Sequence, residues 1–303
     1  MGVLQELEEA TTLVAQKAGS SVVGIGQGWG LGSGVVVADG VVLTNAHNVR
    51  GAEVPLTFGD GHTVTGHVSG VDVDGDLAVL TADTAGTPAL GWADGPAGVG
   101  AIVFALANPG GRGLRVTFGQ VSSVDRSFRG PRGRKVTGSL EHTAPMARGS
   151  SGGPVVDAEG RFLALNTNRL GDGFYQALPA DADLRARVDA LTRGESPTRR
   201  HLGVGLVPGR AARHLRRSVG LPDRDGVLVR EIEDDSPAAR AGLRRGDLIV
   251  EAAGNAVTSI DDLHSALDAL ADGQSLALGV VRGADELSVT VSFVGGTREE
   301  GSA

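Results

Sequence analysis

The sequence predicts two folded units: an all-β barrel or sandwich, followed by a smaller unit of mixed α and β structure. The chain has 303 residues, which corresponds to about two domains. Between residues 20 and 178, short runs rich in valine, leucine and threonine alternate with turns of Gly, Asp, Asn and Pro. Many short strands with turns at this spacing indicate a barrel or a sandwich. A cluster of turn-forming residues at 194–197 separates this region from residues 199–295.

The composition is that of an ordinary soluble globular protein. Hydrophobic residues make up 41% of the chain, charged residues make up 21%, and the formal net charge is -8. The negative charge argues against a protein that coats nucleic acid, because contacts to phosphates need basic surfaces. The chain contains no cysteine, which excludes disulfides, thiolate metal sites and a cysteine nucleophile. We expect no cofactor, no metal site and no nucleic-acid partner.

The chain as given is expected to be cytoplasmic. Its first 20 residues lack the basic region and the apolar region of a signal peptide. No stretch of about 18 apolar residues occurs, so no membrane span is expected. A true start upstream of Met1 would change this expectation to an exported protein.

The individual elements follow from local patterns. Helices are expected over residues 4–17, 181–193 and 260–270. Leu4, Leu7 and Val14 fall on one stripe of the first helix, and Ser259 with Asp262 resembles a capping box at the start of the third. Strands are expected over residues 21–25, 34–37, 41–44, 64–68, 77–80, 102–106, 116–121 and 162–167.

Alternating glycines between residues 24 and 34 raise the question of a phosphate-binding loop. Such loops need G-x-G-x-x-G before a helix, or G-x-x-x-x-G-K-[ST], and neither spacing is present. The residues that follow, VVVADGVVLT, predict a strand, a turn and a strand. The glycines therefore indicate the edge of a tightly packed hairpin, and no phosphate site is assigned.

Three segments carry side chains suited to acyl transfer: TNAH ends at His47, DVDGD ends at Asp76, and GSSGGP contains Ser151. This chemistry needs a hydroxyl made nucleophilic by a base, a carboxylate that orients the base, and backbone N–H groups for the oxyanion. Glycines beside the serine allow the sharp turn that brings the backbone close to a substrate.

Each segment taken alone is weak evidence. A lone histidine is more often a surface or core residue, a Gly-Ser turn is usually only a turn, and neighbouring aspartates usually form a solvated loop. The order His, Asp, Ser at the ends of elements in one all-β region is more specific. The remaining histidines are expected to be structural: His62, His67, His142, His201, His214 and His264.

Over most of residues 20–295 the chain resembles the HtrA/Deg serine proteases of the chymotrypsin fold. The motifs TNAHNV, DGDLAVL and GSSGGP carry the resemblance in the first unit. It implies an all-β double β-barrel, with His47 as general base and Asp76 as orienting carboxylate from the first barrel. It also implies Ser151 as nucleophile from the second barrel, an oxyanion hole formed by the backbone N–H groups of Gly149 and Ser151, and a cleft between the barrels.

Three features depart from the pattern of the relatives. Ser150 stands where digestive relatives carry an acid that pairs with a freed N-terminal amine, so activation by that ion pair is not expected. Pro145 lies near the expected pocket floor, where trypsin-like enzymes place an acid. A neutral pocket disfavours Arg and Lys, because burying an unpaired charge is costly, and cleavage after small aliphatic residues is expected.

Residues 126–135 form a basic segment, expected to be either a solvated surface loop or a mobile regulatory loop.

The C-terminal unit resembles a PDZ domain of the bacterial type, through HLGV, SPAARAGL, GDLIV and GN between residues 201 and 255. A PDZ domain binds a C-terminal peptide as an added strand, with the carboxylate in a nest of backbone N–H groups. The resemblance places this nest at Leu202, Gly203 and Val204. Leu263 and Leu267 on the third helix are candidate side-chain contacts, or else core positions of an amphipathic helix.

The expected organisation is an N-terminal helical segment (1–19), a protease domain (20–180), a helix and linker (181–198), a small α+β PDZ domain (199–295) and a disordered tail (296–303). The expected function is ATP-independent cleavage of unfolded or misfolded polypeptides, with C-terminal peptides bound at the PDZ groove. The alternative is a non-catalytic PDZ scaffold or chaperone. The resemblance also implies a possible homotrimer, although residues 1–20 lack the aromatic residues that hold such trimers together.

Overall fold

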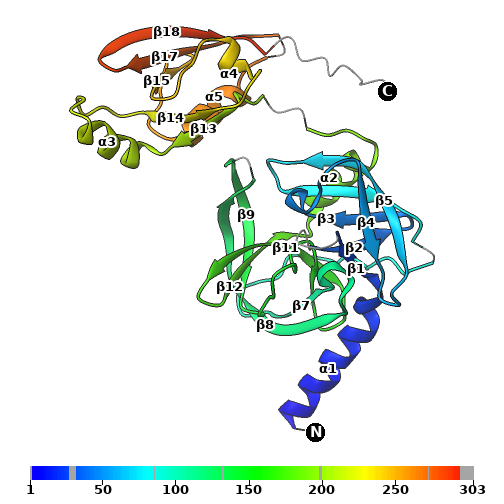
Figure 1. Cartoon of the computed structure of the whole chain (residues 1–303). Coiled ribbons are helices and arrows are strands. Elements are labelled where there is room, and N and C mark those ends of the chain that lie inside the picture. Colours follow the sequence, from blue (N-terminus) through cyan, green and yellow to red (C-terminus); the bar gives the residue numbers. More distant parts are fainter. Residues whose placement is uncertain are drawn as a thin grey trace, which may run out of the picture. The chain divides into compact units, whose positions relative to one another are not determined.

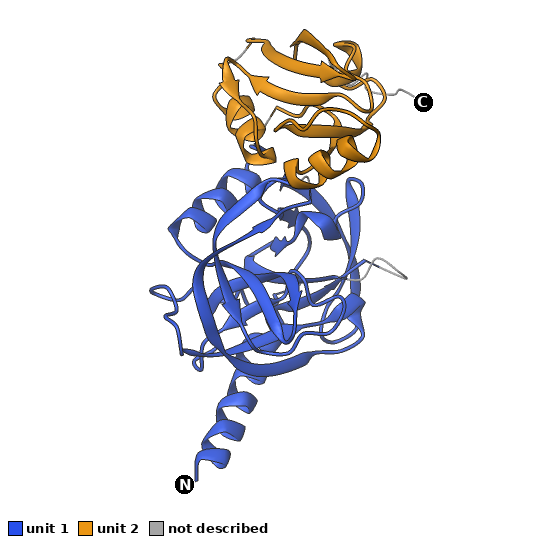
Figure 2. Cartoon of the chain, turned by 90° about the vertical axis from the view of Figure 1, so that its left-hand side faces the viewer, with its two compact units in different colours: residues 1–197 blue, residues 198–303 orange. Residues whose placement is uncertain are grey.

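The computed structural model describes residues 2–26, 32–84, 86–131, 133–197, 200–271 and 273–293. The chain divides into two compact units, residues 1–197 and residues 198–303, which Figure 2 colours separately. Each unit is described by itself.

The first barrel of unit 1 is a closed six-stranded sheet in the order β1-β2-β3-β6-β5-β4 (Figure 1). Its strands are β1 (Val22–Ile25), β2 (Gly32–Ala38), β3 (Val41–Thr44), β4 (Glu53–Thr57), β5 (Thr63–Asp72) and β6 (Leu77–Thr81). Alternate side chains point inward, as the two-residue period of a strand requires. Ile25, Leu56 and Leu80 are among those that fill the interior.

The second barrel closes in the order β10-β11-β12-β9-β8-β7. Its strands are β7 (Ile102–Ala107), β8 (Arg115–Arg129), β9 (Lys135–His142), β10 (Pro154–Val156), β11 (Phe162–Gly171) and β12 (Phe174–Pro179). The two closed barrels confirm the predicted chymotrypsin-like fold of this unit.

One large hydrophobic cluster joins the two barrels and both helices of unit 1. It includes Val14 of α1, Leu43 of β3, Phe104 of β7, Phe162 of β11 and Leu184 of α2. The two barrels therefore share a core, which fixes the residues at their junction.

Two helices flank the barrels: α1 (Val3–Ala18) and α2 (Ala182–Thr192). The start of α1 stays outside the core, because Leu4 is 82% exposed. Leu7 and Ala10 pack against the core, and Val14 and Ala18 are buried in it. At the start of α2, the side chain of Asp181 accepts a hydrogen bond from the backbone N–H of Leu184 at 2.9 Å, as an N-cap residue does.

The basic segment 126–135 is the end of a β-hairpin, entered by β8 and left by β9. Its interpretation as a solvated loop is wrong for Arg134, which is buried and lies 3.2 Å from a carboxylate oxygen of Asp74. Arg132 lies outside the described residues.

Unit 2 contains one antiparallel sheet and three helices among its described residues. The sheet runs β13-β14-β15-β17-β18, with β16 paired to β15. The elements are β13 (Val204–Val207), α3 (Gly209–Ser218), β14 (Val227–Ile232), α4 (Pro237–Arg240), β15 (Leu248–Ala252), β16 (Asn255–Ala256), α5 (Ile260–Asp268), β17 (Leu276–Arg282) and β18 (Asp285–Val291). The capping box of Ser259 and Asp262 is formed at the start of α5. This α+β unit confirms the predicted PDZ-like architecture.

No helix among the described residues is long and apolar enough to cross a membrane.

Candidate active site

His47 lies at the end of β3, in the short 3-10 helix η2 (Ala46–Asn48). Its Nδ1 atom is 2.9 Å from both carboxylate oxygens of Asp76. A carboxylate only accepts hydrogen bonds, so Nδ1 carries the proton and donates it. The backbone N–H of His47 also donates to Asp76 Oδ1, at 3.2 Å. These bonds fix the ring, which is 38% exposed and leaves Nε2 as the acceptor nitrogen.

Asp76 is buried directly before β6 and is held from several sides. Thr167 Oγ1 donates to its Oδ2 at 2.5 Å, and Asn45 Nδ2 donates to its backbone carbonyl at 3.0 Å. Its φ is +52°, in the left-handed region that non-glycine residues rarely adopt. The surrounding contacts must therefore stabilise this backbone conformation.

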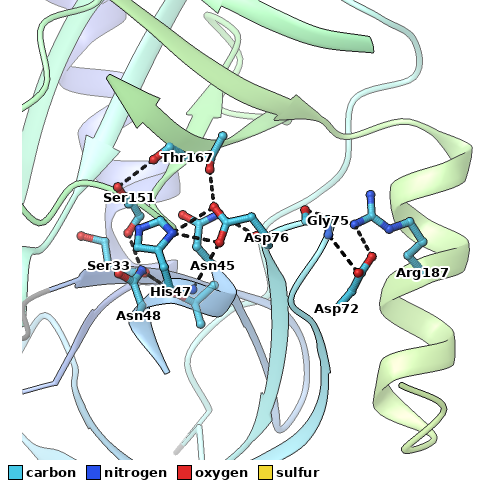
Figure 3. A network of polar contacts seen from close by, with 11 residues as sticks. Ser33, Asn45, His47, Asn48, Asp72, Gly75, Asp76, Ser151, Thr167 and Arg187 are labelled. Atoms are coloured by element: carbon cyan, nitrogen blue, oxygen red, sulfur yellow. Dashed lines mark hydrogen bonds and ion pairs between the residues drawn. The ribbon is translucent and has the colours of Figure 1, made fainter. Parts of the chain in front are cut away.

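Ser151 lies in the turn before β10 and contacts Thr167 of β11, the strand paired with β10. Its Oγ donates to the backbone carbonyl of Thr167 at 2.9 Å. Within the described part of the chain, no hydrogen bond joins Ser151 Oγ to His47. In Figure 3 the imidazole of His47 lies between the side chains of Ser151 and Asp76. Thr167 thus contacts both the hydroxyl and the carboxylate, and the three side chains predicted from the sequence meet at one place.

Two backbone N–H groups beside Ser151 are available to a bound group. Those of Gly149 and Ser151 donate no hydrogen bond to any described residue. The carbonyl of Gly149 is held by Ser33 Oγ at 2.8 Å, and the carbonyl of Ser151 by Ser33 N–H and Asn48 Nδ2, both at 2.9 Å. Gly149 has a φ of +84°, which glycine adopts readily.

Close packing requires a glycine at position 152, directly after Ser151. A Cβ on Gly152 would lie 2.1 Å from the backbone oxygen of Ser33, and its φ is +85°. The turn of the second barrel therefore packs backbone against backbone onto β2 of the first barrel, which explains Gly152. A Cβ on Gly153 would lie 2.1 Å from the backbone oxygen of Leu106, which explains the second glycine of the GSSGGP motif.

A pocket of about 270 Å³ lies beside the Ser151 turn. It is lined by Ala105, Leu106, Ala107, Arg115, Thr117, Pro145, Met146, Ala147, Ser150 and Asn166. No carboxylate is among these lining residues, and Arg115 contributes a positive charge.

His142 is a fully buried residue of β9, in line with its expected structural role. Its Nε2 lies 2.9 Å from Asn166 Oδ1, and its ring stacks on Tyr175. Burial disfavours the imidazolium and lowers the pKa of His142 to about 4, more strongly than the contact with Asn166 raises it.

The acidic loop before β6 differs from a solvated loop, because Asp72, Asp74 and Asp76 are all buried. Asp72 Oδ2 accepts from Arg187 Nη2 of α2 at 2.9 Å, and Asp74 pairs with Arg134. Figure 3 shows the first of these pairs beside Asp76.

The sequence interpretation missed several residues that hold the site. Asn45 and Asn48 stand inside the TNAHNV motif, so the motif itself was a signal for them. Thr167 and Ser33 carry no such signal, because they come from strands remote in sequence and reach the site only after the barrels close.

In unit 2, β13 is an edge strand, and β14 is the one strand paired with it among residues 200–271 and 273–293. The carbonyls of Leu202 and Gly203 accept backbone hydrogen bonds from Ala238 and Glu233, both at 2.9 Å. Their own N–H groups donate to no residue in the described ranges of the chain. Gly203 has a φ of +75°, and Val204 begins β13.

Leu263 and Leu267 were expected as candidate peptide contacts or as core positions. Both side chains are buried in the hydrophobic cluster of unit 2, because they lie on the face of α5 that packs against the sheet. The structure therefore shows the core-position alternative for both residues, and their contact with a bound peptide stays a prediction.

Comparison with known proteins matches residues 32–165 to the trypsin-like peptidase domain and residues 201–293 to the PDZ domain. The putative serine protease HhoA of Synechocystis is 34% identical over 280 residues, covering 86% of this chain and 70% of HhoA. The chain belongs to the HtrA family of serine endopeptidases.

Further relatives within the HtrA family are longer than this chain. A probable periplasmic serine endoprotease, DegP-like, of Halomonas elongata is 33% identical over 86% of this chain and 56% of the relative. The chloroplastic protease Do-like 1 of Arabidopsis thaliana is 31% identical over 87% of this chain and 63% of the relative. The chain thus spans little more than half of the length of the Halomonas protein.

Solved HtrA structures have the same fold. The HtrA-type protease AlgW with decapeptide matches with a TM-score of 0.60 at 24% identity, over 93% of this chain and 97% of AlgW. AlgW with tripeptide matches with a TM-score of 0.56 at 27% identity, over 93% and 95% of the two chains.

Proposed function

We propose that the chain is an active serine endopeptidase in which His47, Asp76 and Ser151 form the catalytic triad. The observation that carries this proposal is the connected set of hydrogen bonds from His47 through Asp76 and Thr167 to Ser151. A buried carboxylate holds Nδ1 of the partly exposed imidazole, and the Ser151 side chain lies on the other side of the ring (Figure 3).

The reaction follows from this geometry. Rotation of the Ser151 side chain moves its hydroxyl from the Thr167 carbonyl to Nε2 of His47. His47 takes the proton as Oγ bonds to the peptide carbonyl carbon, and the N–H groups of Gly149 and Ser151 receive the oxyanion. The imidazolium gives the proton to the leaving amine, the C–N bond breaks, and water repeats the sequence on the acyl-enzyme. Asp76 holds the ring orientation throughout.

Hydrolysis of casein by the wild type and by Ser151→Ala tests the proposal. We expect the variant to lose activity, while Ser20→Ala keeps it, because Ser20 is exposed and belongs neither to the proposed triad nor to the pocket. Equal activity of wild type and Ser151→Ala would favour the alternative function, a non-catalytic PDZ scaffold or chaperone.

We further propose that the substrates are unfolded or misfolded polypeptides, cut after small aliphatic residues without ATP. The support is the pocket beside Ser151, in which alanine, leucine, proline and methionine predominate and Arg115 opposes a basic side chain. Cleavage-site sequencing with a peptide library measures the preference. A profile dominated by Arg or Lys would refute this part of the proposal.

For unit 2 we propose binding of C-terminal peptides along the edge of β13. One support is the unpaired edge of β13 among the described residues. The other is that the N–H groups of Leu202 and Gly203 donate no hydrogen bond to a described residue. Together with the N–H group of Val204, they would form the nest for the carboxylate. The full chain should bind a peptide with a free C-terminal carboxylate and not its amidated form. Equal binding of the two peptides would contradict the nest. A homo-oligomer, a trimer by family resemblance, remains a prediction that a solution mass measurement tests.

A further inference from the structure

The loop that carries Asp76 is held from three sides. It connects β5 to β6 and contains three buried carboxylates, each with a different partner. Asp76 faces His47, Asp74 faces Arg134 of the β8–β9 hairpin, and Asp72 faces a residue of α2. Only the first contact belongs to the reaction, so the other two call for a separate explanation.

The residue of α2 that faces Asp72 is Arg187, and it contacts the loop twice. Its Nη2 donates to Asp72 Oδ2 at 2.9 Å and to the backbone carbonyl of Gly75 at 3.3 Å. Asp72 Oδ1 in turn accepts from the N–H of Gly75 at 2.9 Å. Both peptide groups of Gly75 are therefore held, and the second of them is the peptide that leads into Asp76 (Figure 3).

The contacts of Arg187 and Asp72 with Gly75 lie directly before Asp76, whose backbone conformation is unfavourable. A left-handed φ at a non-glycine residue is unfavourable and persists only where neighbours enforce it. Asp76 has a φ of +52°, and the peptide before it is fixed by Arg187 and Asp72. The loop is also shaped to the guanidinium, because a Cβ on Gly75 would lie 2.1 Å from Arg187 Nη2.

The helix that supplies Arg187 is itself rigidly placed. Leu184, Val188 and Leu191 of α2 are buried in the cluster shared by the barrels. Beyond the helix, Ser196 Oγ accepts from the backbone N–H of Val71 at 3.0 Å, one residue before Asp72. The segment after the second barrel therefore contacts the loop of the first barrel at two successive places.

We propose that Arg187 is a positioning residue for the catalytic carboxylate: through Asp72 and Gly75 it holds Asp76 in the left-handed conformation that aims its carboxylate at His47. This inference rests on the proposed triad. Arg187 touches neither His47 nor Ser151. It acts on the chemical step through the orientation of Asp76, and the fold of the protease unit includes α2 as part of its active-site support.

The test compares Arg187→Gln with Arg187→Lys and with Arg193→Gln. Arg193 is an exposed arginine at the end of the same helix, paired with exposed Glu195, and serves as the matched control. For a peptide substrate we expect Arg187→Gln to lower kcat about 10- to 100-fold, as a misplacement of about 1 Å does, with KM nearly unchanged. Arg187→Lys keeps the charge and should recover part of kcat, and Arg193→Gln should equal the wild type.

A second readout does not depend on turnover. The Nδ1 proton shared by His47 and Asp76 gives a far-downfield proton NMR signal, which His47→Ala assigns. We expect this signal to shift or broaden in Arg187→Gln and to stay in Arg193→Gln. If the wild type shows the signal but hydrolyses no substrate, the proposed function fails. The positioning role of Arg187 is then decided by whether the Nδ1 proton signal shifts or broadens in Arg187→Gln.

An unaltered kcat and an unaltered NMR signal in folded Arg187→Gln would overturn the proposal, and so would a raised KM with unchanged kcat. If Arg187→Gln does not fold because Asp72 is left buried without its partner, the double variant Arg187→Gln with Asp72→Asn removes both charges. A folded double variant with wild-type kcat would assign Arg187 a purely structural role and equally overturn the proposal.

Discussion

Thr167 Oγ1 donates a hydrogen bond of 2.5 Å to Asp76 Oδ2, so a strand of the second barrel holds a carboxylate carried by the first. The backbone carbonyl of the same threonine accepts from Ser151 Oγ. One residue therefore contacts both the carboxylate and the hydroxyl, and the alignment of the site depends on the contact between the two barrels.

Replacement of Thr167 by valine should lower kcat about tenfold, because the buried carboxylate loses a donor worth about 1–3 kcal/mol and the imidazole loses its fixed partner. Thr167→Ser keeps the hydroxyl and should retain most of the activity. Steady-state kinetics and thermal unfolding of both variants measure the effect. Identical kcat in Thr167→Val and wild type would show that the bond does not support the reaction.

Much of this arrangement could be predicted from the sequence. The motifs around His47, Asp76 and Ser151 are local, so their residue types and their order along the chain are enough to indicate the chemistry. The alternation of short apolar runs with turn residues predicted an all-β barrel or sandwich, and the family resemblance implied two barrels.

Four strands of the two barrels were not predicted, β4, β9, β10 and β12, and the first three have local reasons. β4 contains Pro55, which is unusual within a strand, β9 is largely polar, and β10 has only three residues. Pairing across the barrel stabilises these segments, and such long-range pairing has no signature in a local pattern.

The partners of the acidic loop could not be predicted for a related reason. A run of aspartates is usually solvated, and Arg134 and Arg187 lie far along the chain. Only the closed fold brings their guanidinium groups to Asp74 and Asp72. The same holds for Leu263 and Leu267, whose burial depends on which face of α5 meets the sheet.

The buried pair of Arg134 and Asp74 gives a stability prediction. Arg134→Met leaves a buried carboxylate without this partner and should cost about 3–5 kcal/mol of unfolding free energy. Adding Asp74→Leu removes the second charge and should recover much of that loss. Denaturant unfolding of the two single variants and the double variant measures the coupling. Additive losses would contradict a direct pair.

Because of the buried His142, the free energy of unfolding of the first unit should decrease at low pH. Its pKa in the folded chain is lowered to about 4 from an ordinary value of 6.5, so the unfolded chain binds the proton more readily. The contribution of His142 is complete above about pH 6.5 and is lost as the pH falls towards 4, by about 3 kcal/mol in total. Unfolding curves between pH 4 and 7 measure the loss, which His142→Gln should reduce. The same pH slope in both proteins would be the contrary result.

Gly152→Ala should prevent formation of the nucleophile turn, because the new Cβ would lie 2.1 Å from the Ser33 oxygen at a φ that alanine rarely adopts. Gly59→Ala is the matched control, since a Cβ there meets no atom within 4 Å. Casein hydrolysis and thermal unfolding should be impaired in the first variant and unchanged in the second. Wild-type activity in Gly152→Ala would show that the turn is not packed as described.

The most direct measurement of the central claim is covalent labelling of the full chain by a fluorophosphonate, with the modified residue located by mass spectrometry. We expect rapid modification of Ser151 in the wild type and at least about a hundredfold slower modification in His47→Ala, because the hydroxyl is a weak nucleophile without its base. No modification of the wild type, or equal rates in the two proteins, would contradict the account.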